Sequence, residues 1–241
     1  MTNKQLYLEI RKQSKLSFRE GMLAGHFLTR DIGRVCSVWF IKHHVVPNQI
    51  TVLMIIFGIL GSILFAIPNL WCKIFGYFCW LMWFAMDCSD GQVARFTKKF
   101  SKYGTEMDYM AHLIDHPLMN LAIWVTYLEM NMMNPLWLSF IFIIFISCEL
   151  ITRNIYAFDY FHKKIYSDCN SNKKSIKGWF RYFFVNITQY PTFIVCISWI
   201  IVIDYGINNG FSLYIVLIWM IVCIIKCIRA TFNLVRNYYY Q

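Results

Sequence analysis

Two short acidic segments stand out in a chain that carries few charges. Asp87 and Asp90 directly follow the apolar run 74–86, and Asp108 is followed by His112 and Asp115. Residues three or four apart share a helix face, so each segment presents its polar side chains together if it is helical. Carboxylates that converge in a partly dry site repel one another, and a divalent cation relieves that repulsion. Because oxygen ligands favour Mg²⁺ or Mn²⁺, we predict a site for one of these ions.

Small residues and one arginine adjoin these carboxylates. Gly91 and Ala94 leave one helix face open, Arg95 supplies a positive charge, and Gly104 lies in the connection to the second acidic segment. A cation, an arginine and an open helix face together suit a diphosphate. The alternative is a salt-bridged cap at the edge of a membrane, which would bind no ligand.

The elements that must hold these residues are predicted to be membrane-spanning helices. Of the 241 residues, 58% are hydrophobic and only 15% are charged, which excludes a disordered chain, a coiled coil and an ordinary cytosolic enzyme. A spanning helix needs about 20 mostly apolar residues. We predict an all-α membrane protein with six transmembrane helices, over residues 50–67, 71–86, 113–127, 135–148, 190–203 and 211–225.

Positive charge sets the orientation of the predicted bundle. Every Lys and Arg except Lys73 falls in the N-terminal segment, in the C-terminal tail, or in the connections after the second and fourth helices. The positive-inside rule therefore places both termini and the acidic segments in the cytoplasm. The net charge of +10 follows from the same bias, so no nucleic-acid partner is needed to explain it.

The whole chain, residues 1–241, is predicted to form one domain. It divides into an N-terminal cytoplasmic or interfacial segment, a six-helix bundle and a cytoplasmic tail, at residues 1–46, 47–228 and 229–241. In the first segment, apolar residues recur at helical spacing at Leu28, Ile32, Val35 and Trp39. With Arg30 and Arg34 on other faces, this pattern predicts an amphipathic helix in the membrane interface. The nine cysteines include no CxxC pair, which argues against zinc and a disulfide framework.

The spacing of the acidic residues is more specific than their types. The segment Asp87-Cys-Ser-Asp90-Gly91-Gln-Val-Ala94-Arg95 is followed, after eight residues, by Gly104-Thr-Glu-Met-Asp108. This arrangement resembles the signature of the CDP-alcohol phosphotransferase family, DxxDGxxAR and then GxxxDxxxD, and it contains seven of the eight fixed positions. The start of the first predicted helix, Pro47 to Thr51, is also similar to the opening usual in that family.

The resemblance implies a usually dimeric membrane enzyme with six helices and a cytoplasm-facing polar cavity. Such enzymes bind a CDP-linked alcohol and one or two divalent cations, Mg²⁺ or Mn²⁺, transfer the phospho-alcohol group to an acceptor hydroxyl, and release CMP. By the same resemblance Asp87, Asp90 and Asp108 would be metal ligands. The CDP pocket would be shaped by Gly91, Ala94, Arg95 and Gly104, with Thr51 nearby.

The sequence departs from the family pattern at His112, which stands where the family has its last aspartate and presumed general base. We favour His112 as the base, because an imidazole titrates near neutral pH. Neighbouring carboxylates would raise its pKa and a bound cation would lower it. Asp115 is the alternative base, a loss of activity with retained nucleotide binding is a third possibility, and His112 as a metal ligand or acceptor contact is a fourth.

The donor and the acceptor are less specified than the reaction. Similarity to sequences with histidine at this position implies a lipid-linked saccharide as acceptor and a phospho- or phosphonoalkyl group as cargo, in a bacterial inner membrane. The alternatives are a phospholipid head-group synthase and an inactive CDP-binding protein. Glu149 and Arg153, at the cytoplasmic end of the fourth helix, are candidate acceptor contacts, whereas His116 is interpreted as interfacial.

Overall fold

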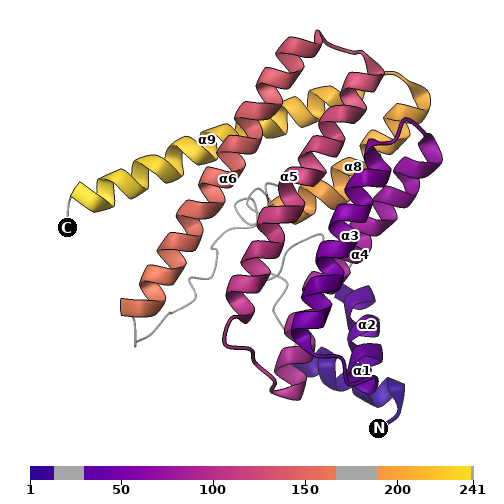
Figure 1. Ribbon diagram of the computed structural model, residues 1–241, viewed down its shortest axis with the longest axis vertical. Helices are drawn as coiled ribbons and strands as arrows, with labels where there is room; N and C mark the ends of the chain where they lie inside the picture. The colour runs from indigo at the N-terminus through magenta and orange to yellow at the C-terminus, as the bar shows by residue number, and fades with distance from the viewer. Residues whose placement is uncertain (14–29, 167–188, 240–241) are drawn as a thin grey trace.

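A computed structural model describes residues 1–13, 30–166 and 189–239, and every regular element in these ranges is an α-helix (Figure 1). In chain order the helices are α1 Asn3–Gln13, α2 Arg30–Lys42, α3 Pro47–Ala66, α4 Leu70–Thr97, α5 Gly104–Met130, α6 Pro135–Tyr166, α8 Tyr190–Ile207 and α9 Phe211–Tyr239. Each predicted span coincides with one helix from α3 onward, but α4, α5, α6 and α9 extend well beyond the predicted bounds. The predicted all-α class is confirmed for these residues.

Local signals explain where the central helices begin and end. Pro47 occupies the first turn of α3, where its missing N–H costs no hydrogen bond. Asn69 caps α4, because its Oδ1 accepts hydrogen bonds from the backbone N–H groups of Trp71 and Cys72 at 2.9 and 3.3 Å. At the end of α5, Asn131 adopts the left-handed conformation, with φ of 52°. These signals make α3, α4 and α5 an antiparallel set with short connections.

Four helical stretches are long and apolar enough to cross a membrane, judged by length and composition over the described residues: Pro47–Ala66, Pro135–Phe158, Tyr190–Ile207 and Phe211–Arg236. The chain is therefore an integral membrane protein. The helices α4 and α5 are of similar length but lie outside this set. Both carry acidic side chains, which lower their mean hydropathy.

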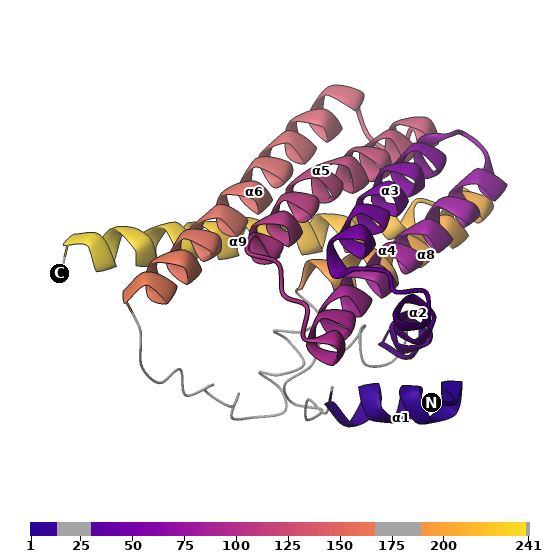
Figure 2. The ribbon, with the colours of Figure 1, turned by 60° about the horizontal axis from the view of Figure 1, so that its bottom comes forward.

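The two N-terminal helices pack beneath the end of the bundle that holds the acidic motif (Figure 2). Gly33 brings α2 close to α4, since a Cβ added there would lie 3.0 Å from the Ala85 carbonyl oxygen and from Cys88 Cβ. On the next turn, the Ser37 hydroxyl donates to Gln92 Oε1 at 3.0 Å. These contacts fix α2 along the helix that carries the first half of the motif.

The polar and apolar faces of α2 are only partly as predicted. Ile32, Val35 and Trp39 are exposed on the side that faces away from the protein, as an interfacial helix requires, whereas Leu28 lies outside the described residues. Arg34, however, is buried and pairs with Asp31. It is buried because α2 uses this face, together with Gly33 and Ser37, to pack against α4.

At the end of α4 opposite the acidic motif, a buried lysine joins three helices. The side chain of Lys73 is fully buried, and its Nζ donates to the Phe65 carbonyl oxygen at 2.9 Å and to Thr126 Oγ1 at 3.0 Å. The same ammonium group lies 3.0 Å from Glu129 Oε2. The lysine that interrupts an otherwise apolar predicted span is thus paired inside the bundle.

Candidate metal and active site

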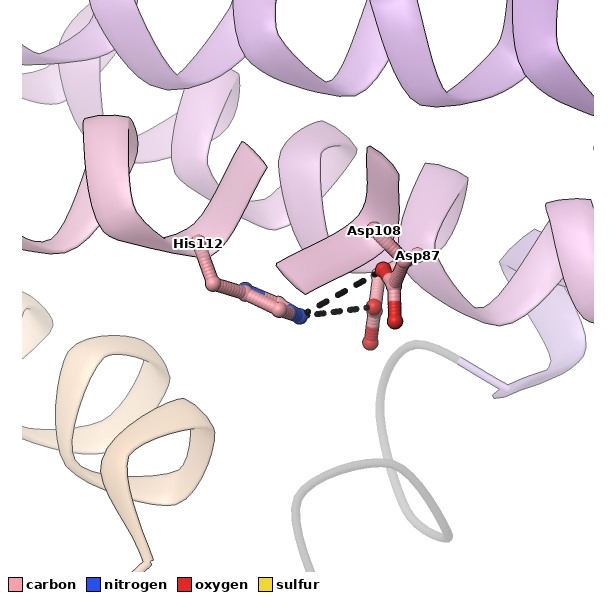
Figure 3. Close-up of side chains that lie close together, drawn as sticks. All are labelled: Asp87, Asp108 and His112. Carbon is pink, nitrogen blue, oxygen red and sulfur yellow. Dashed lines mark ion pairs between the residues drawn. The ribbon is translucent and has the colours of Figure 1, made fainter. Parts of the chain in front are cut away.

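Three side chains from α4 and α5 converge where α4 leaves its apolar segment (Figure 3). His112 Nε2 lies 3.3 Å from Asp87 Oδ1 and 3.6 Å from Asp108 Oδ1. One ligand atom from each of these residues lies within 4.8 Å of the other two, the spacing of groups that hold one metal ion. The antiparallel course of α4 and α5 brings together residues that are more than 20 positions apart in the sequence.

Two features of these residues fit a divalent cation. Asp108 Oδ1 is buried and has no hydrogen-bond partner among the described residues, so a lone pair remains available for a ligand bond. Burial raises the pKa of Asp108, and the charge of Asp87 raises it further, against the opposing charges of His112 and Arg153. A bound cation would stabilise the ionised carboxylates that burial and mutual repulsion disfavour.

The same carboxylates control the protonation of His112. Burial by itself lowers the pKa of His112, but the hydrogen bond to Asp87 and the charges of Asp87 and Asp108 outweigh burial, so the net shift is upward. The other ring nitrogen, Nδ1, is buried and without a hydrogen-bond partner in the described part of the chain. Nε2 is therefore the nitrogen that faces the acidic groups.

Asp90 lies beside this cluster, with both of its oxygens engaged. Thr51 Oγ1 donates to Asp90 Oδ2 at 2.9 Å, and the backbone N–H of Gly91 donates to Oδ1. Burial, together with the charges of Asp87 and Asp108, raises the pKa of Asp90 to about 7. The contact with Thr51 ties the start of α3 to the first half of the motif.

Asp115 does not join the other polar residues. It is fully buried, and its Oδ2 accepts a hydrogen bond from Trp83 Nε1 at 2.8 Å. A Cβ added at Gly58 of α3 would lie 2.4 Å from its carboxyl group, so the α3 backbone closes over it. Although Asp115 follows His112 by one turn, it points into the junction of α3, α4 and α5.

The remaining motif residues line the surface next to the carboxylates. The Arg95 guanidinium lies over Gly91, because a Cβ added at Gly91 would be 3.0 Å from Arg95 Nη1. Ala94 is half-buried and Arg95 is exposed on the same stretch of α4. Gly104 begins α5, and a Cβ there would meet only the Ser101 side chain at ordinary contact distance. Gly91 thus allows the close approach of a guanidinium, whereas Gly104 is not sterically required.

A second polar cluster lies next to the first and contains both candidate acceptor contacts. Glu149 Oε1 and Arg153 Nη2 lie 3.0 and 2.8 Å from His116 Nδ1. The Tyr190 ring stacks on His116 at a centroid distance of 3.6 Å. His116 is therefore fully buried, and its interfacial interpretation is wrong. The spacings of four in His112–His116 and Glu149–Arg153 were the available signal for this cluster.

The helices and the convergent acidic residues define a class of protein: an integral membrane protein with a candidate site for a divalent cation at one end of its bundle. Residues 44–222 match the family model for CDP-alcohol phosphatidyltransferase. The chain belongs to this family, and α1 and α2 precede the matched region. No curated protein matches the chain.

Proposed function

We propose that the protein is a metal-dependent membrane transferase that moves a phospho-alcohol or phosphonoalkyl group from a CDP-alcohol to an acceptor hydroxyl and releases CMP. The observation that carries this proposal is the convergence of Asp87, Asp108 and His112 from two helices, in a chain of this family. Transfer of this kind depends mainly on positioning and on charge stabilisation. An arginine over an open helix face, beside paired carboxylates, supplies both.

Each motif residue has a proposed task. Asp87, Asp90 and Asp108 hold Mg²⁺ or Mn²⁺, which when bound offsets the negative charge of a diphosphate. Arg95 contacts the diphosphate, and the small residues Gly91 and Ala94 leave room for it, with Thr51 and Gly104 at the edges of the same pocket. Thr51 also orients Asp90 through its hydrogen bond.

We propose His112, and not Asp115, as the general base. His112 Nε2 faces the acidic cluster, whereas Asp115 is fully buried against Gly58 and its Oδ2 is bonded to Trp83. A base must reach the hydroxyl whose proton it takes, and Asp115 lies too deep for that. The contact with Asp87 requires a proton on Nε2, so His112 can accept the proton of the acceptor there only when Asp87 and Asp108 hold the cation instead; their charge then stabilises the protonated ring.

We propose that the acceptor is a lipid-linked saccharide and that Glu149 and Arg153 contact it. Glu149 Oε2 is buried and has no hydrogen-bond partner within the described residues, so a sugar hydroxyl would satisfy it. Arg153 is partly exposed and supplies a donor beside it. A phospholipid head-group synthase would use the same reaction with a different acceptor, and the experiment below distinguishes the two.

The membrane arrangement is proposed on the same basis. We propose six spanning helices in a single domain of residues 1–241, with α2 as an interfacial helix; the six are α3, α4, α5, α6, α8 and α9. The distribution of Lys and Arg supports a cytoplasmic site and cytoplasmic termini. We also propose a homodimer, which is usual in the family, and a bacterial inner membrane, which the similarity to sequences with histidine at position 112 implies.

The test is CMP release by purified protein in detergent, supplied with a panel of CDP-alcohols and with either a lipid-linked glycan extract or a phospholipid extract. We expect release that requires Mg²⁺ or Mn²⁺, stops with EDTA, and is absent in the Asp87→Asn variant. Mass spectrometry of the product identifies the acceptor. If no CMP is released with any donor and acceptor, or if CMP release is unaffected by EDTA, the proposal is contradicted.

A further inference from the structure

Two polar contacts join α4 to α5, one turn apart on each helix. The first is the pair of Asp87 and His112, whose Oδ1 and Nε2 atoms are 3.3 Å apart. The second lies deeper in the bundle, where Trp83 Nε1 donates to Asp115 Oδ2 at 2.8 Å. Trp83 precedes Asp87 by four residues and Asp115 follows His112 by three, so the two contacts are stacked along the antiparallel helices.

The deeper contact also touches the His112 ring directly. Trp83 is fully buried and lies edge-on to His112, with ring centroids 5.6 Å apart and an interplanar angle of 77°. His116 packs against the same imidazole at 5.1 Å. Since neither Trp83 nor His116 is exposed, these two buried rings constrain the orientation of His112.

Asp115 in turn fixes the Trp83 ring. The indole N–H is a donor only, and a buried donor without an acceptor is costly, so the bond to Asp115 selects one orientation of the ring. The carboxyl group cannot swing away, because the α3 backbone at Gly58 lies against it. Asp115, Trp83 and His112 thus form a chain of contacts from a fixed point on α3 to the nitrogen that faces Asp87 and Asp108.

We infer that Asp115 is a positioning residue, which orients Trp83 and through it holds His112 Nε2 against Asp87 and Asp108. This inference rests on the proposed reaction, in which His112 Nε2 takes the acceptor proton. It assigns a role to the buried carboxylate that differs from that of a base, since a positioning acceptor needs only an oxygen atom and not a negative charge.

The first test compares Asp115→Asn with Asp115→Leu by CMP release. The amide retains an oxygen that accepts from Trp83, so we expect kcat within about threefold of wild type, whereas the leucine should lower kcat roughly 10²-fold, the usual effect of misplacing a catalytic group by about 1 Å. KM for the CDP-alcohol should stay within about threefold in both variants, since Arg95 and Gly91 are untouched. Equal losses of about 10²–10⁴-fold in the two variants would identify a base and overturn the inference.

Tryptophan variants test the same contact from its other side. Trp83→Phe keeps a ring beside His112 but removes the N–H donor, so it should reproduce the loss caused by Asp115→Leu, and the double variant should lose no more than either single one. Trp80→Phe is the matched control: Trp80 is fully buried one turn away on α4, and its Nε1 has no partner among the described residues. A normal kcat for Trp83→Phe, or equal losses in both phenylalanine variants, would overturn the inference.

A readout without turnover separates this inference from the proposed function. In ¹⁵N-histidine-labelled protein in detergent, with His112→Ala used to assign the signals, we expect Asp115→Leu and Trp83→Phe to shift the His112 ring resonances and Asp115→Asn to leave them in place. If wild type releases no CMP but the spectra behave this way, the proposed reaction fails and the positioning contact stands. Unshifted His112 resonances in Asp115→Leu would overturn the contact itself.

Discussion

His112 should lower the affinity of the site for Mg²⁺, and replacing His112 with aspartate should raise that affinity. In wild type, His112 lies 3.3 Å from Asp87 and 3.6 Å from Asp108 and offsets their charge. His112→Asp introduces a carboxylate into the same space. At a separation of roughly 5 Å and an effective dielectric constant of about 20, one like-charge pair costs about 3 kcal/mol. A divalent ion relieves this repulsion, so part of it appears as binding energy.

Solvent exposure in the structure reduces the part of this repulsion that contributes to Mg²⁺ affinity. The Asp108 side chain is 43% exposed, so water screens its pair with the new carboxylate, while Asp87 is only 21% exposed. Counting about half of the Asp87 pair gives about 1.5 kcal/mol, or roughly a tenfold gain in Mg²⁺ affinity. Imidazole is also a poorer ligand for Mg²⁺ than a carboxylate, which acts in the same direction.

The assay is isothermal titration of Mg²⁺ into detergent-solubilised protein, with His112→Asn as the control of similar size and no charge. We expect His112→Asp to bind at least tenfold more tightly than wild type, and His112→Asn, which removes the positive charge of His112 without adding a negative one, to lie between the two. Without metal, His112→Asp should unfold at a lower temperature than wild type, and saturating Mg²⁺ should reverse this difference. Equal or weaker Mg²⁺ binding by His112→Asp would refute the placement of position 112 beside a cation held by Asp87 and Asp108.

Three further expectations follow from the same structure. Asp87→Asn and Asp108→Asn should each lower CMP release by at least about 10³-fold and abolish Mn²⁺ binding seen by electron paramagnetic resonance, and tight Mn²⁺ binding in either variant would exclude that residue as a ligand. The raised pKa of Asp90, about 7, means that its carboxyl is mostly ionised at pH 8 and mostly protonated at pH 6. Because the cation binds the ionised form, Mn²⁺ affinity should fall about tenfold from pH 8 to pH 6, and Asp90→Asn should flatten this dependence. Glu129→Gln leaves the ammonium of Lys73 buried without its counter-charge and should cost about 3–5 kcal/mol of stability in thermal unfolding, whereas removing both charges with Lys73→Met and Glu129→Leu should cost less.

The helices could be predicted from their apolar runs, and the convergence of the two motif segments from helical spacing and a short connection. Apolar runs located α3, α4, α5, α6, α8 and α9, and the antiparallel course of neighbouring helices placed Asp87 near Asp108. The lengths of the helices could not be predicted in the same way, because α4 and α5 continue as helix where their side chains become polar. Hydropathy reports where a helix is apolar, and not where its hydrogen bonding stops.

The burial of Arg34 shows a second limit of periodicity. Apolar spacing on α2 correctly identified Ile32, Val35 and Trp39 as one face, but it did not show that the other face, which carries Arg34, is buried. That face packs on α4 through Gly33 and Ser37, which hydropathy does not mark as contact residues. A glycine and a serine one turn apart indicate close helix approach only when the partner helix is known.

Asp115 illustrates why a motif of spaced residues does not determine their roles. Spacing alone puts His112 and Asp115 within one turn, and on an isolated helix both would be candidates for the same task. What separates them is the tertiary contact that each meets: acidic side chains of α4 for His112, and the indole of Trp83 and the backbone at Gly58 for Asp115. An aspartate is compatible with either environment, so its type carries no information about which one it occupies. The environment of Asp115 is instead indicated by Gly58, which leaves space for its carboxyl group, and by Trp83, which donates a hydrogen bond to it. These residues lie 57 and 32 positions before Asp115 in the sequence.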